Sequence, residues 1–477
     1  MNQIESWLTS LSNLVWGPHL LILLVGTGIF LTVRLGFIQV TRLGVGLKEA
    51  FIPKAEQPKK KQRGDISHFQ ALMTALAATV GTGNMVGVAT AIVLGGPGAV
   101  VWMWLSGFVG MATKYAEAIL AVKYRVVDER GEVAGGPMYY LEHGLKKKWL
   151  GVLFAVFASV AAFGIGNGVQ TNSISLALNN SFNVPMVVTG IVMMAVTAFV
   201  ILGDLTPPKM TNAVIVMMAV TAFVILGGVK SIGKVVGIFV PFMIFAYVGS
   251  GLVILIMNLE LVPGALSTMF SSTFSAEAIG GGALGAAIRY GVARGVFSNE
   301  AGLGSAPIAA AAAKTDFPGR QALVSMTQVL IDTLIVCSIT GLTIVMSGQY
   351  TEGLEGIALT QASFAYFLGP IGEIIVTISL VFFAYSTVLG WCYYGERSAY
   401  YLLGEKVIVP YRVLYILVAG LGAMTTNLNL IWSISDVFNG LMAIPNLIGL
   451  LFLSGVVVAE TKRFELERKK EGQSSAA

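Results

Sequence analysis

Charged side chains are scarce in this sequence: they make up 12% of its 477 residues, about half of the share usual in a soluble globular protein. Cysteine and histidine are rarer still, with two and three residues. Because Cys337 and Cys392 both lie in apolar runs, the sequence has neither a disulfide framework nor a Cys/His metal cluster. The apolar runs also contain no HExxH motif, no paired aspartates and no Ser/His arrangement, so we expect a protein that is not an enzyme.

Hydrophobic residues dominate instead, at 55% of the chain with a mean hydropathy of +0.78. At about 20 apolar residues per membrane span, the apolar runs leave almost no room for a soluble domain. The sequence therefore predicts an all-α integral membrane protein that lies in the lipid bilayer, with residues 1–477 forming one membrane domain.

The basic residues fall in alternate loops. Eight lie from Arg34 to Arg63, six from Lys123 to Lys148 and five from Lys462 to Lys470, whereas the loops 179–185 and 348–364 hold none. Loops rich in lysine and arginine stay in the cytoplasm. This pattern accounts for the net charge of +5 without a nucleic-acid partner, and it predicts a multi-pass cell-membrane protein with a cytoplasmic C-terminus.

Eleven spans fit this charge pattern, because an odd number connects an outside N-terminus to a cytoplasmic C-terminus. The first apolar segment has no basic residue before it and no cleavage site after it, so we expect a retained helix rather than a signal peptide. The spans are expected at about 7–36, 67–95, 99–124, 149–178, 186–228, 231–258, 280–313, 320–347, 370–403, 408–426 and 431–459.

The ten spans after the first divide into two sets of five. We assign residues 1–37 to an extra N-terminal helix, 66–258 to the first set, 280–459 to the second set and 460–477 to a cytoplasmic tail. Since each set has an odd number of spans, the two sets enter the membrane from opposite sides. That geometry is an inverted repeat.

One stretch of the first set is duplicated. The thirteen residues Ile191–Gly203 recur letter for letter as Ile215–Gly227, so the segment 204–227 reads as a recent tandem duplication. If both copies crossed the membrane, every later basic loop would change side. We therefore predict that only one copy occupies the native span.

Two of the spans are interrupted near their middles by glycine and small polar residues, at 80–84 and at 295–302. A backbone that is not helical at membrane depth is tolerated only where protein or a polar cavity satisfies its N–H and C=O groups. Paired breaks of this kind point to the binding site of a transporter. We expect the two broken helices to cross side by side at the midplane.

In the first break, the freed N–H groups around Thr82 and Gly83 favour a carboxylate. The freed carbonyls at 77–80 suit a sodium ion, and Asn84 adds a side-chain oxygen. The alternative is an unbroken helix on which Gly83 and Gly87 form a small-residue packing face.

The second break holds Ser298 and Asn299, which are candidates to line the site. Ionisable groups in apolar runs usually face a bundle interior or water. For Arg294 and Glu300, a salt bridge or intracellular gate is the alternative to direct contact with a ligand.

A third polar stretch, residues 162–171, contains glycines that permit close approach of another backbone, including Gly166. Asn167 and Gln170 are able to point at a polar guest from this stretch. The alternative is interhelical hydrogen bonding between tightly packed helices.

Taken together, the polar motifs of the chain closely resemble those of the alanine/glycine:cation symporter family, over essentially the whole sequence except about residues 204–227. The motifs that carry the resemblance are GTGN at 81–84, LGGPGA at 94–99, WMW at 102–104, GMATKYAE at 110–117, AGGPMY at 134–139, RGVFSNEAG at 294–302 and NLIGL at 446–450.

The resemblance implies a secondary transporter that couples sodium entry to the uptake of alanine or glycine, with sodium as the coupling ion and no organic cofactor. It implies the 5+5 inverted-repeat fold of the leucine transporter, with one extra N-terminal helix and two discontinuous helices. By analogy, residues 80–84 resemble the segment that binds the substrate carboxylate. The carbonyls of Ala77 and Val80 with the hydroxyls of Ser386 and Thr387 resemble a sodium site.

A small amino acid needs a small pocket. We expect the bulky side chains of Phe163, Phe297 and Trp391 to form its walls. A cavity bounded by rigid aromatic rings excludes leucine by steric overlap, which discriminates more strongly than one missing methylene does.

Two rival functions remain open at this point. A proton-coupled amino-acid carrier would use Asp332 or Glu300 as its proton site. An ion channel needs a continuous pore, usually built by oligomeric symmetry, and these asymmetric breaks suit a single-chain site better. A monomer is therefore the expected unit.

Overall fold

The computed structural model describes residues 3–52, 64–128, 131–202, 228–274, 283–425 and 429–474. Within these ranges the chain is helical almost throughout, with one short hairpin, β1 (Val126–Val127) and β2 (Val133–Ala134). Seven helices are long and apolar enough to cross a membrane, and a bent helix pair makes an eighth. The structure therefore supports an all-α membrane protein, while the number eleven stays a prediction.

The first half of the chain begins with two helices where one was expected, because Pro18 has no N–H to continue the helix after Gly17. The helices of this half are α1 (Gln3–Val15), α2 (Pro18–Arg34), α3 (Ile38–Thr41), α4 (Leu43–Phe51), α5 (His68–Thr79), α6 (Val88–Gly95), α7 (Ala99–Lys123), α8 (Pro137–Tyr139), α9 (Lys148–Phe163), α10 (Val169–Phe182), α11 (Met186–Leu202) and α13 (Gly228–Met257). Three π-helical turns lie among them, η1 (Gly83–Gly87), η2 (Tyr140–Gly144) and η3 (Gly164–Gly168).

The second half continues the same construction. Its helices are α14 (Val262–Phe274), α16 (Ala283–Asn299), α17 (Ala306–Ala311), α18 (Pro318–Val329), α19 (Ser338–Ser347), α20 (Gly356–Leu368), α21 (Pro370–Leu403), α22 (Ile408–Met424), α23 (Asn429–Phe452) and α24 (Ser454–Ser474). A π-helical turn, η4 (Leu330–Cys337), joins α18 to α19. The sequence did not indicate α14 and α20, nor that the predicted tail is mostly the helix α24.

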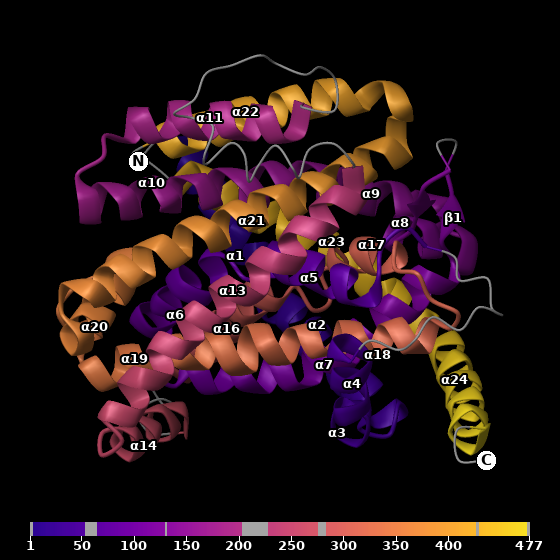
Figure 1. The fold of residues 1–477 in the computed structure, drawn as a ribbon, viewed down its shortest axis with the longest axis horizontal. Coiled ribbons are helices and arrows are strands. Elements are labelled where there is room, and N and C mark those ends of the chain that lie inside the picture. Colours follow the sequence, from indigo (N-terminus) through magenta and orange to yellow (C-terminus); the bar gives the residue numbers. More distant parts are fainter. Residues whose placement is uncertain are drawn as a thin grey trace.

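Figure 1 shows α11 and α22 lying side by side at the top of the view, and α24 extending from the bundle at the lower right. The first duplicated copy, which begins at Ile191, forms most of α11 and packs against α22. The second copy, which begins at Ile215, lies outside the described residues, so the prediction that one copy occupies the span stays a prediction.

The two broken helices run antiparallel and contact each other at both ends. At one end, backbone hydrogen bonds join Ile66, just before α5, to Ala312 and Lys314, just after α17. At the other end, a Cβ on Gly95 would lie 3.2 Å from the backbone of Ala287 in α16. The contacts at both ends hold the two broken helices side by side.

Candidate functional site

The first break occurs where the sequence predicts it. The α5 helix ends at Thr79, Val80 is extended with φ −77° and ψ 92°, and α5 is bent by 53° relative to the helix that continues through α6. The N–H of Gly81 donates to Oδ1 of Asn84 at 2.9 Å, and the N–H of Thr82 donates to Oε1 of Gln170 at 3.1 Å. Asn84 and Gln170 therefore satisfy the broken backbone.

The hydroxyl of Thr82 lies in this break, fully buried, and has no hydrogen-bond partner among the described residues. A buried hydroxyl without a partner loses free energy relative to water unless a ligand or solvent pairs with it. Thr82 is thus a polar side chain that is available to a guest, as is Asn167, whose Oδ1 also has no partner among the described residues.

The second break lies at Glu300–Ser305, about five residues after the start that the sequence predicts. Gly295 lies within the helix α16 and packs closely against α7, since a Cβ there would lie 2.9 Å from Oγ of Ser106. The chain leaves the helix where Glu300, Gly302 and Gly304 take positive φ values of 58°, 90° and 86°.

Two buried carboxylates hold the second break. Oε1 of Glu117 accepts hydrogen bonds from the N–H groups of Gly302 and Gly304, both at 3.1 Å, and from Asn446 at 2.7 Å. Oε1 of Glu300 accepts one from the indole N–H of Trp391 at 2.7 Å. The sequence included Glu117 and Asn446 only as parts of motifs, and their partners are far apart in the chain.

The first break contacts the helix that leads into the second break, at Gly83 and Ser298. A Cβ on Gly83 would lie 2.9 Å from Cα of Ser298, so only glycine permits this approach. The buried carboxylate of Asp332, in η4, accepts from the side chain of Asn84 at 2.8 Å and from Oγ of Ser298 at 2.9 Å. Asp332 therefore links the first break to that helix, and Asn299 reaches the same group through Thr333.

Three of the four residues of the expected sodium site contact one another near the end of α5, while the ion itself stays a prediction. The hydroxyls of Ser386 and Thr387, on α21, each donate to the carbonyl of Ala77 at 3.1 Å. Val80 is buried at the C-terminus of the same helix. A Cβ on Gly81 would lie 2.5 Å from Oγ1 of Thr387, so α21 contacts the broken backbone directly.

The three aromatic residues expected as pocket walls take different partners. Trp391 packs on Gly166, where a Cβ would lie 2.0 Å from Cβ of Trp391. Phe297 stacks on Trp432 with ring centroids 5.5 Å apart. Phe163 packs against the rings of two tyrosines, with its centroid 4.8 Å from that of Tyr411.

Arg294 pairs with Asp436 and not with Glu300, so the salt bridge considered as an alternative to ligand contact does not form between these two residues. The Arg294 guanidinium forms its ion pair with Asp436 at 3.5 Å and lies over the ring of Trp432 at 5.1 Å. These groups line an open pocket of about 440 Å³, which Leu94 and Tyr290 also border. The signal for Asp436 was a single carboxylate in the apolar run 431–459.

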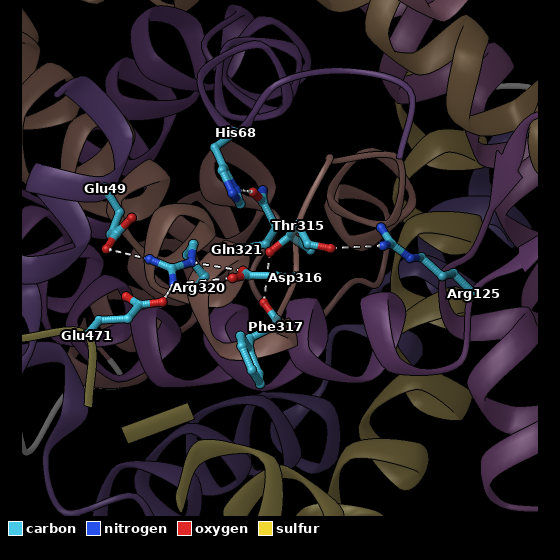
Figure 2. Close-up of polar contacts among 9 residues, drawn as sticks. All are labelled: Glu49, His68, Arg125, Thr315, Asp316, Phe317, Arg320, Gln321 and Glu471. Carbon is cyan, nitrogen blue, oxygen red and sulfur yellow. Dashed lines mark hydrogen bonds and ion pairs between the residues drawn. The ribbon is translucent and has the colours of Figure 1, made fainter. Parts of the chain in front are cut away.

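A cluster of ion pairs surrounds Arg320 on the side of the molecule where Ile66 pairs with Ala312 and Lys314, and Figure 2 shows this cluster. Arg320 contacts Glu49 at 3.1 Å, Asp316 at 3.0 Å and Glu471 at 2.7 Å. Burial raises the pKa of the Asp316 carboxyl, but the Arg320 guanidinium beside it outweighs this effect and holds that pKa below its ordinary value. Arg125 donates to the carbonyls of Ala311, Ala313 and Thr315 on the same face.

The sequence matches the model of the sodium:alanine symporter family over residues 1–216 and 205–477. A protein of Methanococcus maripaludis named sodium/alanine symporter AgcS is 56% identical over 478 residues, which cover 98% of this chain and 99% of the relative. The probable sodium/glutamine symporter GlnT of Bacillus subtilis is 38% identical over 472 residues, covering 98% of this chain and 92% of the relative.

Among solved structures, the chain resembles MhsT in complex with L-phenylalanine. The TM-score is 0.53 with 15% sequence identity, and the match covers 84% of this chain and 99% of that chain. At this identity the likeness shows the fold alone, and it agrees with the all-α architecture described above.

Proposed function

Because the chain belongs to the sodium:alanine symporter family, we propose that it couples the entry of Na⁺ to the uptake of alanine or glycine by alternating access. The family and its relatives are transporters and not enzymes. The observation that carries the proposal is the contact at Gly83 and Ser298 between the first break and the helix that leads into the second break, beside the hydroxyls of Ser386 and Thr387.

For the coupling ion, the proposed ligands are the carbonyls of Ala77 and Val80 and the hydroxyls of Ser386 and Thr387. They fit a hard cation because all four groups are uncharged oxygens, and the two hydroxyls already lie against the Ala77 carbonyl. A sodium ion here would join α21 to the end of α5. It would thereby organise the first break before the amino acid binds, so each ligand raises the affinity of the other.

For the amino acid, the proposed contacts are the backbone N–H of Gly83 and the unpartnered Thr82 hydroxyl, because the Thr82 N–H already donates to Gln170. The carboxylate would lie at the N-terminal end of the helical segment that begins with η1, where the helix dipole favours negative charge. Asn84, Gln170 and Ser298 would support this segment through the hydrogen bonds described above. Phe163, Gly166, Phe297 and Trp391 are proposed to limit the size of the side chain.

The 440 Å³ pocket gives this site its proposed route of entry. Phe297 is 5% exposed and stacks on Trp432, which lines the pocket. The Arg294–Asp436 pair lies at the same place. We assign this pocket to the outer side of the membrane, and the Arg320 face to the cytoplasmic side.

Uptake in proteoliposomes tests the proposal through Asn84→Ala. This change removes the group that caps Gly81 and contacts Asp332, so we expect sodium-driven alanine uptake to fall at least tenfold. Asn180→Ala is the control, because Asn180 is exposed on α10. Full uptake by Asn84→Ala would contradict the site.

The same proteoliposomes distinguish sodium coupling from proton coupling. A pH gradient in sodium-free buffer should drive no alanine uptake if Na⁺ is the coupling ion. Uptake under that gradient would instead favour proton coupling through Asp332 or Glu300.

A further inference from the structure

A second, small cavity lies on the Arg320 side of the breaks, away from the site described above. Its volume is about 10 Å³, which is room for about one water molecule. It is enclosed by the half-helices α5 and α17, which approach the breaks from this side, and by α7 and α18. The lining residues used here are Ala75, Lys114, Ala306, Ala310, Ser325 and Gln328.

Two lining residues carry polar atoms of opposite character without hydrogen-bond partners among the described residues. These atoms are Nζ of Lys114, a donor, and Oε1 of Gln328, an acceptor. Both side chains are at least 98% buried. A buried ammonium is strongly unfavourable unless it is paired, so an unpaired lysine beside a cavity indicates a group that receives a partner.

Three carboxylates interact electrostatically with Lys114, and each already accepts hydrogen bonds from other groups through at least one oxygen, while Oε2 of Glu117 has no partner among the described residues. Oε1 of Glu117 binds the second break and Asn446, Glu300 binds Trp391 and Ser305, and Asp332 binds the first break and Ser298. They offset the charge of Lys114 through space but supply it with no hydrogen bond.

The amide of Gln328 lies against the half-helix that precedes the first break. Its Nε2 donates to Oγ1 of Thr79, the last residue of α5, at 2.9 Å. The acceptor of this cavity is therefore attached to the half-helix whose movement would open the route to the Arg320 face. The walls contributed by Ala75, Ala306 and Ala310 leave space for small side chains only.

From these contacts we propose that the cavity is an exit subsite for a zwitterionic amino acid. After α5 swings away from α17, Lys114 binds the carboxylate of the leaving amino acid and Gln328 accepts a hydrogen bond from its ammonium group. The subsite rests on the proposed function, because it needs an amino acid that leaves on this side.

The test compares Lys114→Gln and Gln328→Met with the full-length wild type in proteoliposomes. Equilibrium binding of alanine with sodium should stay within about twofold, since the central site is intact. The kcat of uptake should fall about tenfold, and the KM for efflux from the α24 side should rise about tenfold. Uptake and efflux share one equilibrium constant, so a variant must lower kcat/KM by the same factor in both directions. A tenfold lower kcat of uptake is therefore matched by a tenfold higher KM of efflux.

Two matched variants exclude a structural role. Thr79→Val removes the hydrogen bond from Nε2 of Gln328 but leaves its acceptor, so the efflux KM should stay within about twofold. If Lys114 merely balanced the charge of Glu117, then Lys114→Gln with Glu117→Gln would restore the efflux KM. Under our proposal the double variant keeps the raised KM.

The outcomes separate the two proposals. A wild type without sodium-dependent alanine binding and uptake would overturn the proposed function. A wild type that transports, with an unchanged efflux KM in both single variants, would overturn the subsite alone. So would a tenfold loss of alanine binding in both variants, because the central site would then be the part affected.

Discussion

Ser386 and Thr387 are adjacent on α21, and both of their hydroxyls donate to the carbonyl of Ala77 near the end of α5. Each hydroxyl also donates to the carbonyl of Phe383 in its own helix, which is the common behaviour of serine and threonine in a span. Hydrogen bonding within α21 does not account for the additional contacts with Ala77 in α5, and these contacts support the proposed sodium site.

Thr387→Val should therefore raise the sodium concentration for half-maximal alanine uptake about tenfold. Valine keeps the shape of threonine but removes one oxygen ligand, a loss of roughly 1.4 kcal/mol of binding free energy. The measurement is uptake against sodium concentration. Ser398→Ala is the control, since its hydroxyl donates only within α21, to the carbonyl of Tyr394; equal sodium affinity in Thr387→Val and wild type would rule out the ligand role.

The breaks themselves show how a helix is interrupted by its neighbours. Glycine residues occur along both broken helices, but the chain leaves helical geometry only where other side chains satisfy its amides. Asn84 and Gln170 do so in the first break, and Glu117 does so in the second. Gly295, by contrast, is a helical packing glycine.

A glycine at a break and a glycine elsewhere in the helix should therefore respond differently to substitution, and Gly83 and Gly87 test this. Gly83→Ala would place Cβ 2.9 Å from the backbone of Ser298, so the first break and α16 must separate. We expect a loss of sodium-driven uptake of at least tenfold and a lower melting temperature. In Gly87→Ala the new Cβ would lie 3.8 Å from its nearest neighbour, the carbonyl oxygen of Thr82, so uptake should stay within about twofold of the wild type. Equal losses in both would favour the simple packing face formed by Gly83 and Gly87.

At the level of the whole molecule, Arg320 connects three segments that are distant in sequence. It joins α4, the loop before α18 and the C-terminal helix α24 through Glu49, Asp316 and Glu471 (Figure 2). The Arg42–Glu465 and Lys123–Glu460 pairs hold α24 at two further points. The predicted cytoplasmic tail is therefore docked on the bundle.

Arg320→Gln should lower the melting temperature of the purified protein and increase proteolysis within α24. Removing one partner of a buried ion pair is destabilising by about 3 to 5 kcal/mol, and the partial exposure of Glu471 reduces this. Thermal unfolding and limited trypsin digestion measure both effects. Lys462→Gln, at an exposed position of the same helix, should match the wild type.

The lowered pKa of Asp316 adds a pH dependence with a definite sign. The stabilisation by its pair with Arg320 is present above about pH 4, the ordinary pKa of aspartate, and is lost as the pH falls through the lower folded pKa. The difference in melting temperature between wild type and Arg320→Gln should therefore narrow below about pH 4. A constant difference down to pH 3 would contradict the contribution of Asp316.

The orientation of the chain is tested by the accessibility of its C-terminus in intact cells. We predict that a C-terminal tag is protected from added protease, because the positions of the basic residues predict that the basic loops and α24 lie on the cytoplasmic side. Cleavage of the tag in intact cells, but not of a cytoplasmic control protein, would mean that both copies of the duplicated segment cross the membrane.

The sequence by itself determined the membrane class, the helical fold, the family and the first break. Composition, charge placement and glycine spacing act locally, and each is readable from neighbouring residues. Tertiary structure alone decided that the second break begins at Glu300, that Arg294 pairs with Asp436, and that Lys114 and Gln328 border one cavity. These outcomes depend on helices remote in sequence, because a buried polar group takes whichever partner the packing brings within reach.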